Sequence, residues 1–346
     1  LNLPTQVVVL SGLTTGTIIT ASSNHWLLAW SGLELNMLSM LTIMMKPKHP
    51  RAAEATIKYF LTQTIASTLM LFSGTMNAIQ TGQWNITQMT DEYACTMLLL
   101  AMTMKIGAAP IYFWLPEVMQ GATTTTALII ASWQKIAPIT ILFMTYNHLP
   151  PKITTLIAIT SAIIGGWGSI NQTQMRKLMA YSSISNLGWT MAILTISPYI
   201  AILNITIYIT MIIPTFMIMK KTSMKTLQDS TTMWTSSTTA NTTLTLMLLS
   251  LSGLPPLTGF TPKLLILNEL VMQNLTPIAT MMAMSSLINM FFYIRTTYIT
   301  TMTTPPIMSS NMMKWRLNSM QQKLTSTLAL LSLMSLPLTP TLMHMI

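Results

Sequence analysis

The chain has 346 residues, of which 51% are hydrophobic and only 7% are charged. This composition excludes a water-soluble domain, because a soluble domain of this size carries a far more highly charged surface. Apolar runs of about 20 residues recur along the chain, the length that a helix needs to cross a bilayer. A transmembrane β-barrel would instead show short segments of alternating polarity. The sequence therefore predicts an all-α polytopic membrane protein.

The formal net charge is +10, but the basic residues lie in short links between apolar runs and form no patch interleaved with aromatic residues. This distribution argues against a nucleic-acid-binding protein. The single cysteine, Cys95, excludes an internal disulfide and a cysteine-ligated cluster. The four histidines are scattered one to a segment, so the sequence predicts no metal site.

Methionine is unusually frequent, at 34 copies, and threonine and isoleucine are abundant beside it. This bias is typical of an AT-rich genome in which additional codons specify methionine, as in animal mitochondria. The composition therefore favours a protein encoded in a mitochondrial genome.

The apolar runs predict about eleven membrane crossings. They lie at residues 3–22, 24–45, 57–80, 93–111, 123–146, 151–170, 176–196, 198–219, 240–271, 276–299 and 324–344. Pro47 and Pro50 end the second run, because proline lacks the N–H that would continue a helix. Stretches rich in threonine and serine at 222–239 and 300–311 predict loops.

Lysine and arginine are distributed very unequally between the two sides of the predicted bundle. Thirteen of the 17 fall on the side that holds the N-terminus, three lie inside the membrane segments, and only Lys152 lies on the opposite side. The positive-inside rule places the N-terminal side in the compartment of synthesis, which is the matrix for a mitochondrial chain. An odd number of crossings then places the C-terminus on the intermembrane side.

Two of the runs are interrupted by glycine and proline in a similar way. The fourth breaks at residues 107–110 (GAAP), soon after Lys105, and the ninth breaks at residues 252–260 (SGLPPLTGF), shortly before Lys263. A broken helix leaves backbone groups unpaired, and a water-filled cavity can satisfy them. Paired broken helices in the two halves of a transporter indicate an inverted repeat with a central ion path.

Four charged residues fall inside predicted membrane segments or beside their breaks: Glu34, Lys105, Lys135 and Lys263. A lysine at the centre of a spanning helix costs roughly 2.5–3.5 kcal/mol, so a retained one indicates a functional role or a buried partner. A carboxylate and a lysine within reach titrate as a pair, and we expect Glu34 and Lys105 to do so. The structural alternative is that Lys135 extends to the membrane interface and Lys263 lies at the mouth of its break.

Several cofactor motifs are missing from the sequence. It contains no Gly-x-Gly-x-x-Gly after a strand, no phosphate-binding loop, no Cys-x-x-Cys and no paired histidines for haem. We therefore expect no nicotinamide, flavin, iron–sulfur cluster or haem in this chain.

Four stretches of the chain together resemble one membrane-protein family. They are residues 105–118 (KIGAAPIYFWLPEV), 133–138 (WQKIAP), 171–183 (NQTQMRKLMAYSS) and 253–260 (GLPPLTGF). Their order and spacing are similar to those of NADH-ubiquinone oxidoreductase chain 2, and the similarity extends essentially from end to end.

The resemblance implies an antiporter-like, proton-pumping subunit in the membrane arm of respiratory complex I, in the mitochondrial inner membrane. It implies one membrane domain over residues 1–346, with half-repeats at 24–146 and 151–299 and a C-terminal helix at 324–344. Glu34 and Lys105 would then form an interacting pair. Lys135 would be the central relay and Lys263 the terminal lysine of a buried path of side chains and water.

The same resemblance implies that NADH, FMN, iron–sulfur clusters and ubiquinone bind other subunits of the complex. The expected partners are other membrane-arm subunits and membrane lipids, with cardiolipin as a candidate. The family often has histidine two residues after Pro110, where this chain has Tyr112. A phenol carries protons near neutral pH less readily than an imidazole, so an obligatory histidine relay at that position is not expected.

Two other functions remain open. A free-standing cation/proton antiporter would share the broken helices and the lysines, although the sequence shows no embedded pair of aspartates and no cluster of cation ligands. A structural subunit without its own pumping path would use its buried charges only to fix the packing of helices.

Overall fold

The computed structural model describes residues 3–235, 237–304, 323–334 and 337, and the chain divides into two compact units. Unit 1 comprises Leu1–Ser161 and Leu194–Pro198, and unit 2 comprises Ala162–Ile193 and Tyr199–Ile346. The described residues form helices joined by short links, with two isolated β-bridges and no strand among them. The predicted all-α architecture is confirmed, whereas the division into inverted half-repeats stays a prediction.

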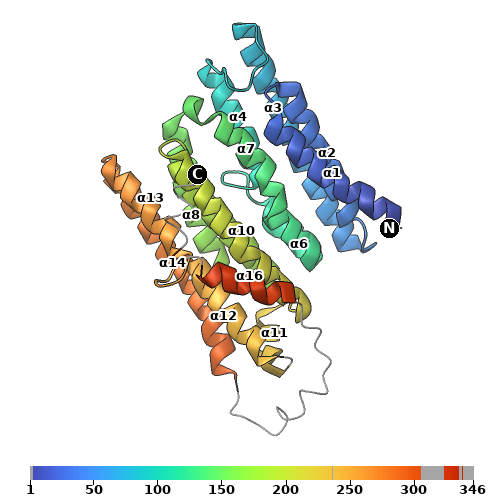
Figure 1. The fold of residues 1–346 in the computed structure, drawn as a ribbon, viewed down its shortest axis with the longest axis vertical. Coiled ribbons are helices and arrows are strands. Elements are labelled where there is room, and N and C mark those ends of the chain that lie inside the picture. The colour runs from blue at the N-terminus through green and yellow to red at the C-terminus, as the bar shows by residue number, and fades with distance from the viewer. Residues whose placement is uncertain (1–2, 236, 305–322, 335–336, 338–346) are drawn as a thin grey trace. The chain divides into compact units, whose positions relative to one another are not determined.

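Unit 1 follows the first five predicted runs and begins the sixth. Its elements are α1 (Leu3–Ser22), α2 (Trp26–Met44), α3 (Pro50–Thr81), α4 (Glu92–Ile106), α5 (Trp114–Gly121), α6 (Thr124–Ala131), the 3₁₀ turn η1 (Trp133–Lys135), α7 (Ile136–Met144), the 3₁₀ turn η2 (Tyr146–His148) and the first part of α8 (Pro151–Ser169). Helix α1 packs along α2, α2 along α3, and α3 along α4 (Figure 1). Helix α5, which follows the first break, returns to pack on α3.

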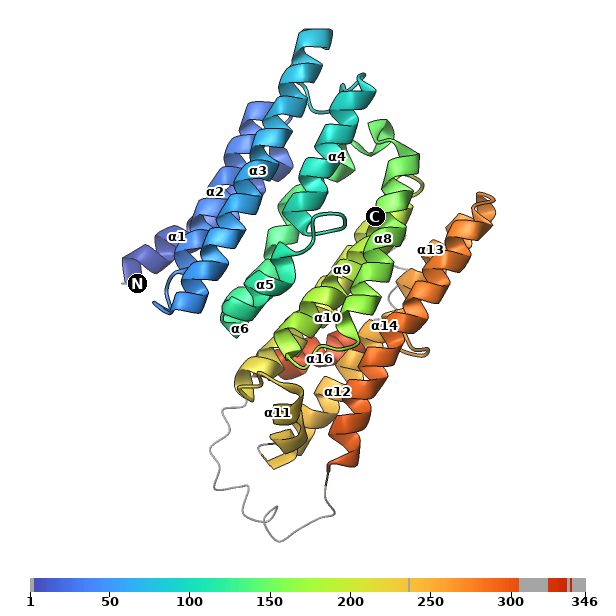
Figure 2. The ribbon, with the colours of Figure 1, turned by 180° about the vertical axis from the view of Figure 1, so that it is seen from behind.

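Unit 2 holds the later runs. Its elements are the end of α8, α9 (Met175–Leu194), α10 (Pro198–Lys221), α11 (Leu227–Thr232), the 3₁₀ turn η3 (Met233–Thr235), α12 (Thr238–Ser252), α13 (Phe260–Met272), α14 (Thr276–Met302) and α16 (Lys323–Met334). Helices α12 and α13 both pack against α14, and α16 packs against α12 (Figure 2). Of the predicted crossing at 324–344, residues 324–334 belong to α16, and nearly all of the rest lies outside the described residues.

Side chains that accept hydrogen bonds start several of these helices. Nδ1 of His25 accepts a hydrogen bond from the backbone N–H of Leu27 at 3.2 Å, and His49 does the same for Arg51 at 3.2 Å. The Asp91 carboxylate accepts from the backbone N–H of Ala94 at 3.3 Å. Each acceptor satisfies one of the N–H groups that have no partner in the first turn of a helix.

The many threonines inside the helices satisfy their own hydroxyl groups. The hydroxyls of Thr64, Thr68 and Thr75 on α3 donate to the backbone carbonyls three residues earlier, at 2.9–3.0 Å. The same local bond recurs along most of the other helices. A hydroxyl bonded in this way needs no water, so a helix rich in threonine can still face lipid.

Five described helical segments are each long and apolar enough to cross a membrane: Thr5–Ser22, Trp26–Met44, Thr124–Met144, Pro198–Lys221 and Thr276–Met302. Large apolar side chains on their outer faces are exposed, while many polar side chains are buried inside the units. This inversion of the pattern of a soluble protein agrees with a multi-pass membrane protein. The count of eleven crossings stays a prediction.

The predicted loop at 222–239 is wrong in part, because it contains α11 and η3. Thr226 and Asp229 form a reciprocal capping box: Thr226 Oγ1 accepts from the Asp229 N–H at 3.3 Å, and Asp229 Oδ2 accepts from the Thr226 N–H at 2.8 Å. Asp229 also accepts from the Lys225 N–H at 2.8 Å. The Thr-x-x-Asp spacing is a signal for the start of a helix, but in a long stretch of polar residues it does not stand out from its surroundings. Of the other predicted loop, 300–311, residues 300–302 belong to α14 and residues 305–311 lie outside the described part.

Replacing Asp229 with alanine should loosen α11 selectively. Loss of a capping carboxylate costs about 1 kcal/mol, which corresponds to a roughly fivefold fall in amide protection at residues 225–229. Hydrogen exchange of the assembled protein, read by mass spectrometry, measures this fall. T231A is the control, because Thr231 lies on the same short helix and its hydroxyl bonds only within it.

The loss of amide protection caused by D229A should be the same at pH 7 and pH 5. Hydrogen bonds from the Thr226 and Lys225 N–H groups lower the pKa of Asp229 in the folded chain. The stabilising contribution is therefore complete above the ordinary aspartate pKa of about 4 and is lost only as pH falls through the lower folded-state value. A difference between variant and parent that shrinks between pH 7 and pH 5 would contradict this assignment.

Candidate functional site

The first break in unit 1 follows Lys105. Helix α4 ends at Ile106 because Gly107 takes a left-handed conformation with φ of 82°. The N–H groups of Gly107 and Ala108 both donate to the Thr103 carbonyl at 2.9 Å. This tight closure leaves the carbonyls of residues 104 and 105 without partners in their own helix.

Side chains from neighbouring elements supply the missing donors at this break. Trp114 Nε1 of α5 donates to the Met104 carbonyl at 3.0 Å, and Gln63 Nε2 of α3 donates to the Lys105 carbonyl at 3.4 Å. The Trp114 ring also packs edge-on against Tyr59, with ring centroids 5.8 Å apart. Side chains of α3 and α5 therefore satisfy the open carbonyls of α4 and fix the geometry of the break.

The Lys105 side chain is 5% exposed and lies in the last turn of α4. The negative end of a helix dipole favours a cation at this position. The Glu34 carboxylate of α2 lies close enough to Lys105 and to the Tyr59 hydroxyl for its charge to act on both, and a shared proton between Glu34 and Lys105 stays a prediction. Glu34 and Lys105 nevertheless form no direct ion pair, and Glu34 Oε1 is buried without a hydrogen-bond partner. A proton can pass between these groups only through an intervening group such as water.

Lys135 lies on η1, at a third interruption that the sequence did not predict. The run 123–146, expected as one helix, consists of α6, η1 and α7. Lys135 is 2% exposed, which does not agree with a lysine that extends to the interface. Beside it, Gln134 Nε2 donates to Asn36 Oδ1 of α2 at 3.0 Å, and η1 also packs against α4. Unit 1 thus brings together the elements that carry Glu34, Lys105 and Lys135.

Unit 2 holds the second break and Lys263. Helix α12 ends at Ser252, Gly253 is left-handed with φ of 84°, and α13 begins at Phe260. Lys263 is 9% exposed, so it lies at the break, as expected, but is buried there. Its Nζ donates to the Ser252 carbonyl at 2.6 Å and lies 6.0 Å from the centroid of the Trp189 ring.

The two breaks have the same construction within their separate units. Each ends a 15-residue helix at a left-handed glycine, and each is followed by a cis X-Pro peptide bond, Ala109–Pro110 or Pro255–Pro256. Each also places a lysine at the carbonyl end of the shortened helix. Lys105 belongs to that helix itself, whereas Lys263 comes from the helix that follows. The dipole and the unpaired carbonyls make both positions favourable for a protonated amine.

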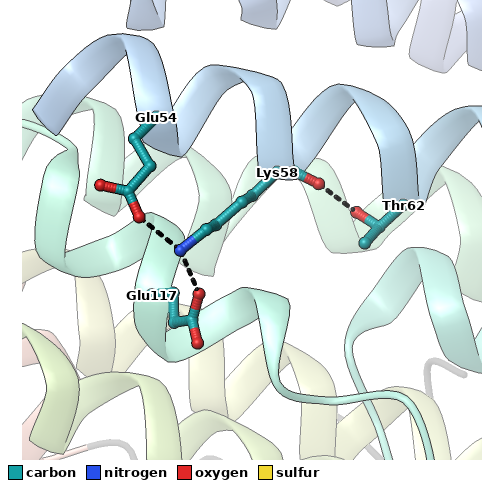
Figure 3. Close-up of polar contacts among 4 residues, drawn as sticks. All are labelled: Glu54, Lys58, Thr62 and Glu117. Carbon is teal, nitrogen blue, oxygen red and sulfur yellow. Dashed lines mark hydrogen bonds and ion pairs between the residues drawn. The ribbon is translucent and has the colours of Figure 1, made fainter. Parts of the chain in front are cut away.

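Sequence reasoning missed a cluster of charges between α3 and α5. Lys58 Nζ lies 2.5 Å from Glu54 Oε1 and 2.6 Å from Glu117 Oε2, so a single ammonium bridges two carboxylates (Figure 3). Glu117 belongs to α5, directly after the break, and the bridge connects that helix to α3. The spacing of Glu54 and Lys58 predicts a pair on one helix, but nothing in the sequence points to Glu117 as the third member.

Among the described residues, no group of three or more His, Cys, Asp and Glu side chains is placed to hold a metal ion. The positions of Lys105, Lys135 and Lys263, buried among helix ends, suit the binding and release of protons.

Comparisons with known proteins identify the family. A family model described as NADH:quinone oxidoreductase/Mrp antiporter, TM, matches residues 23–289, and one described as NADH dehydrogenase subunit 2 C-terminus matches residues 290–343. NADH-ubiquinone oxidoreductase chain 2 of Varanus nebulosus is 50% identical over 338 residues, 97% of each chain. The chain belongs to the NADH-ubiquinone oxidoreductase chain 2 family. Its relative in Xenopus laevis is 48% identical over 336 residues, 96% of this chain and 97% of the relative.

Solved structures show the same fold as this chain. A chain of respiratory complex I from Thermus thermophilus with bound aureothin matches 93% of this chain and 77% of its own length, with a TM-score of 0.80 at 22% identity. A chain of the Mrp complex from Dietzia sp. DQ12-45-1b matches 85% of this chain and 60% of its own length, with a TM-score of 0.77 at 15% identity. These likenesses confirm the antiporter-like architecture.

Replacing Gly253 with alanine should disturb the second break more than G82A disturbs the end of α3. Both glycines are left-handed, and an alanine in that conformation costs roughly 1–2 kcal/mol. An added Cβ at Gly253 would lie 2.9 Å from Cδ and Nζ of Lys263, whereas nothing lies within 4 Å of one at Gly82. Hydrogen exchange at the two helix ends measures the difference. Equal losses of protection would show that Lys263 does not pack on Gly253.

Proposed function

We propose that this chain translocates protons through a buried path that includes Glu34, Lys105, Lys135 and Lys263. Membership in the chain 2 family makes it a membrane-arm subunit of the proton-translocating NADH:ubiquinone oxidoreductase, complex I. The observation that carries the proposed path is the repeated placement of a buried lysine at the carbonyl end of a broken helix.

The chemistry at these sites is the exchange of protons between amines, a carboxylate and water. Two opposing effects act on the protonation of a buried amine close to the carbonyl end of a helix: burial disfavours the cation, and the helix dipole favours it. A small change in the surrounding charge then suffices to release or bind a proton. Glu34 supplies such a charge to Lys105. In each transfer one nitrogen or oxygen gives up a proton and the next group or water molecule accepts it.

The remaining assignments follow from the family. We assign the chain to the mitochondrial inner membrane, with its N-terminus on the matrix side and its C-terminus on the intermembrane side. NADH, FMN, the iron–sulfur clusters and ubiquinone are assigned to other subunits of the complex. The partners are other membrane-arm subunits, and cardiolipin is the candidate lipid, because basic residues gather on one side of the bundle.

A structural subunit is the main alternative. In that case the buried charges would fix helix packing, and their removal would lower stability without changing the number of protons moved per electron. A free-standing antiporter is the second alternative. The likeness to the Mrp chain reflects the fold alone, whereas the two family models and the chain 2 relatives favour the respiratory complex.

Neutralising Lys105 should separate pumping from structure. K105M keeps an unbranched side chain of nearly the same length and removes its proton-binding group, so quinone-coupled proton uptake should fall roughly tenfold or more. The measurement is the number of protons moved per electron by the assembled complex in liposomes, with NADH and a quinone as substrates. K152M is the matched control, because Lys152 is exposed.

One further readout and one further variant distinguish a pumping defect from a loss of folding. Electron transfer from NADH to a water-soluble artificial acceptor should be unchanged, since that reaction does not need the membrane path. E34Q should reproduce the defect of K105M while keeping the shape of the side chain. A K105M complex that assembles and pumps like K152M would leave the structural alternative standing.

A further inference from the structure

Unit 2 contains a second group of buried polar residues, apart from the lysines. Asn204 and Tyr208 lie one turn apart on α10, and Asn289 and Tyr293 lie one turn apart on α14. All four side chains are at most 5% exposed. The spacing of four residues places each asparagine and tyrosine on one face of its helix. We call these four residues the Asn–Tyr cluster.

Two serines of α9 face the tyrosines of this cluster. The Ser183 hydroxyl lies within reach of the Tyr208 hydroxyl, and the Tyr208 and Tyr293 hydroxyls are close enough to affect each other electrostatically. The Ser182 hydroxyl lies near the Tyr293 hydroxyl, but the Tyr293 hydroxyl has no hydrogen-bond partner. Both serines donate their own protons to backbone carbonyls of α9 at 2.7 Å, so their oxygens remain free to accept.

Three polar atoms of the Asn–Tyr cluster have no partner in the protein: Asn204 Nδ2, Asn289 Oδ1 and the Tyr293 hydroxyl. A buried donor or acceptor without a partner bears its full cost of desolvation, so native proteins satisfy nearly all of them. Asn289 Oδ1 and the Tyr293 hydroxyl, one turn apart on one face of α14, offer an acceptor and a hydroxyl to ordered water, which needs two to four polar partners, and Asn204 Nδ2 offers a buried donor on α10. Gly166 of α8 lies directly against the amide of Asn289, since a Cβ there would lie 3.0 Å from Asn289 Oδ1.

A polar face of α9 leads from this cluster towards Lys263. Ser182, Ser185 and Trp189 recur at intervals of three and four residues, so they share one side of the helix, and all three are buried. Trp189 is the residue over which Lys263 Nζ lies, at 6.0 Å from the ring centroid. From Ser182 to Trp189 the helix rises roughly 10 Å, a distance that a few water molecules span.

We propose that the Asn–Tyr cluster and Ser182 and Ser183 hold ordered water and form a branch that delivers protons to Lys263 along α9. This inference deepens the proposed function and rests on it. Each hydroxyl or water molecule gives up the proton it holds as it accepts the next one, so no tyrosinate forms and nothing is oxidised or reduced. The tyrosines are relay groups, and the asparagines orient the water.

The branch has an identifiable outer end. Helix α9 begins at Met175, and Arg176 and Lys177 lie in its first turn, about one and a half turns before Ser182. On α14, Arg295 follows Tyr293 by two residues, and its Nη1 donates to the Ile170 carbonyl in the link before α9 at 2.9 Å. The Asn–Tyr cluster therefore lies between this basic end of α9 and Lys263.

The test uses the assembled complex in liposomes and compares buried with exposed tyrosines on the same helices. Y208F, Y293F and the double variant each keep the ring and remove only the relay hydroxyl. Y199F on α10 and Y298F on α14 are matched controls, because both of these tyrosines are 58% exposed. We expect the double variant to lower proton uptake per electron roughly tenfold and the controls to match the parent. A double variant that assembles and pumps like the controls would overturn the branch.

The outcomes of this test and of the lysine test are distinguishable. A defect in K105M together with normal pumping in the double tyrosine variant refutes the branch and leaves the lysine path intact. Normal pumping in both refutes the proposed function itself. Should the tyrosine variants fail to assemble, a cryo-EM map of the unaltered complex decides: ordered density bridging Asn204, Asn289 and Tyr293 supports the branch, and a dry space there overturns it.

Discussion

The structure depends on one constraint, which is that no backbone carbonyl can remain unpaired in an apolar environment. A continuous helix meets the constraint by itself, and a broken helix cannot. At the end of α4 the open carbonyls accept from Trp114 and Gln63, and at the end of α12 the Ser252 carbonyl accepts from Lys263. The breaks are thus costly unless polar side chains gather around them, and that requirement concentrates the polar groups where a proton path needs them.

The same constraint explains why the two lysines can have different partners. Lys263 donates one of its three N–H groups to the Ser252 carbonyl, and this hydrogen bond fixes the position of its amine. Lys105 is held by its position in the last turn of α4 and by the field of Glu34 rather than by a direct ion pair. A tight ion pair would trap the proton, whereas an indirect interaction lets the charge of one group alter the proton affinity of the other.

Much of this arrangement could be predicted from the sequence. The lengths of the apolar runs gave the helices, and the Gly and Pro residues after Lys105 and before Lys263 located both breaks. The association of Glu34 with Lys105 was also expected. The interruption at Lys135 was not, because residues 132–135 contain neither glycine nor proline and the run is continuously apolar around them. Contacts between residues far apart in the chain, such as Lys58 with Glu117, also carry no local signal.

The way threonine hydroxyls bond within their own helices affects how this chain can change over generations. Threonine codons differ from those of isoleucine, methionine and alanine by a single nucleotide. Since the hydroxyl of Thr68 or Thr75 serves only a carbonyl of its own turn, its loss leaves no neighbouring group without a partner. Mutational pressure on the genome can therefore exchange these residues almost neutrally. That freedom ends where a hydroxyl also interacts with a side chain of another helix, as Ser183 of α9 does with Tyr208 of α10, and there we expect substitutions to be rarest.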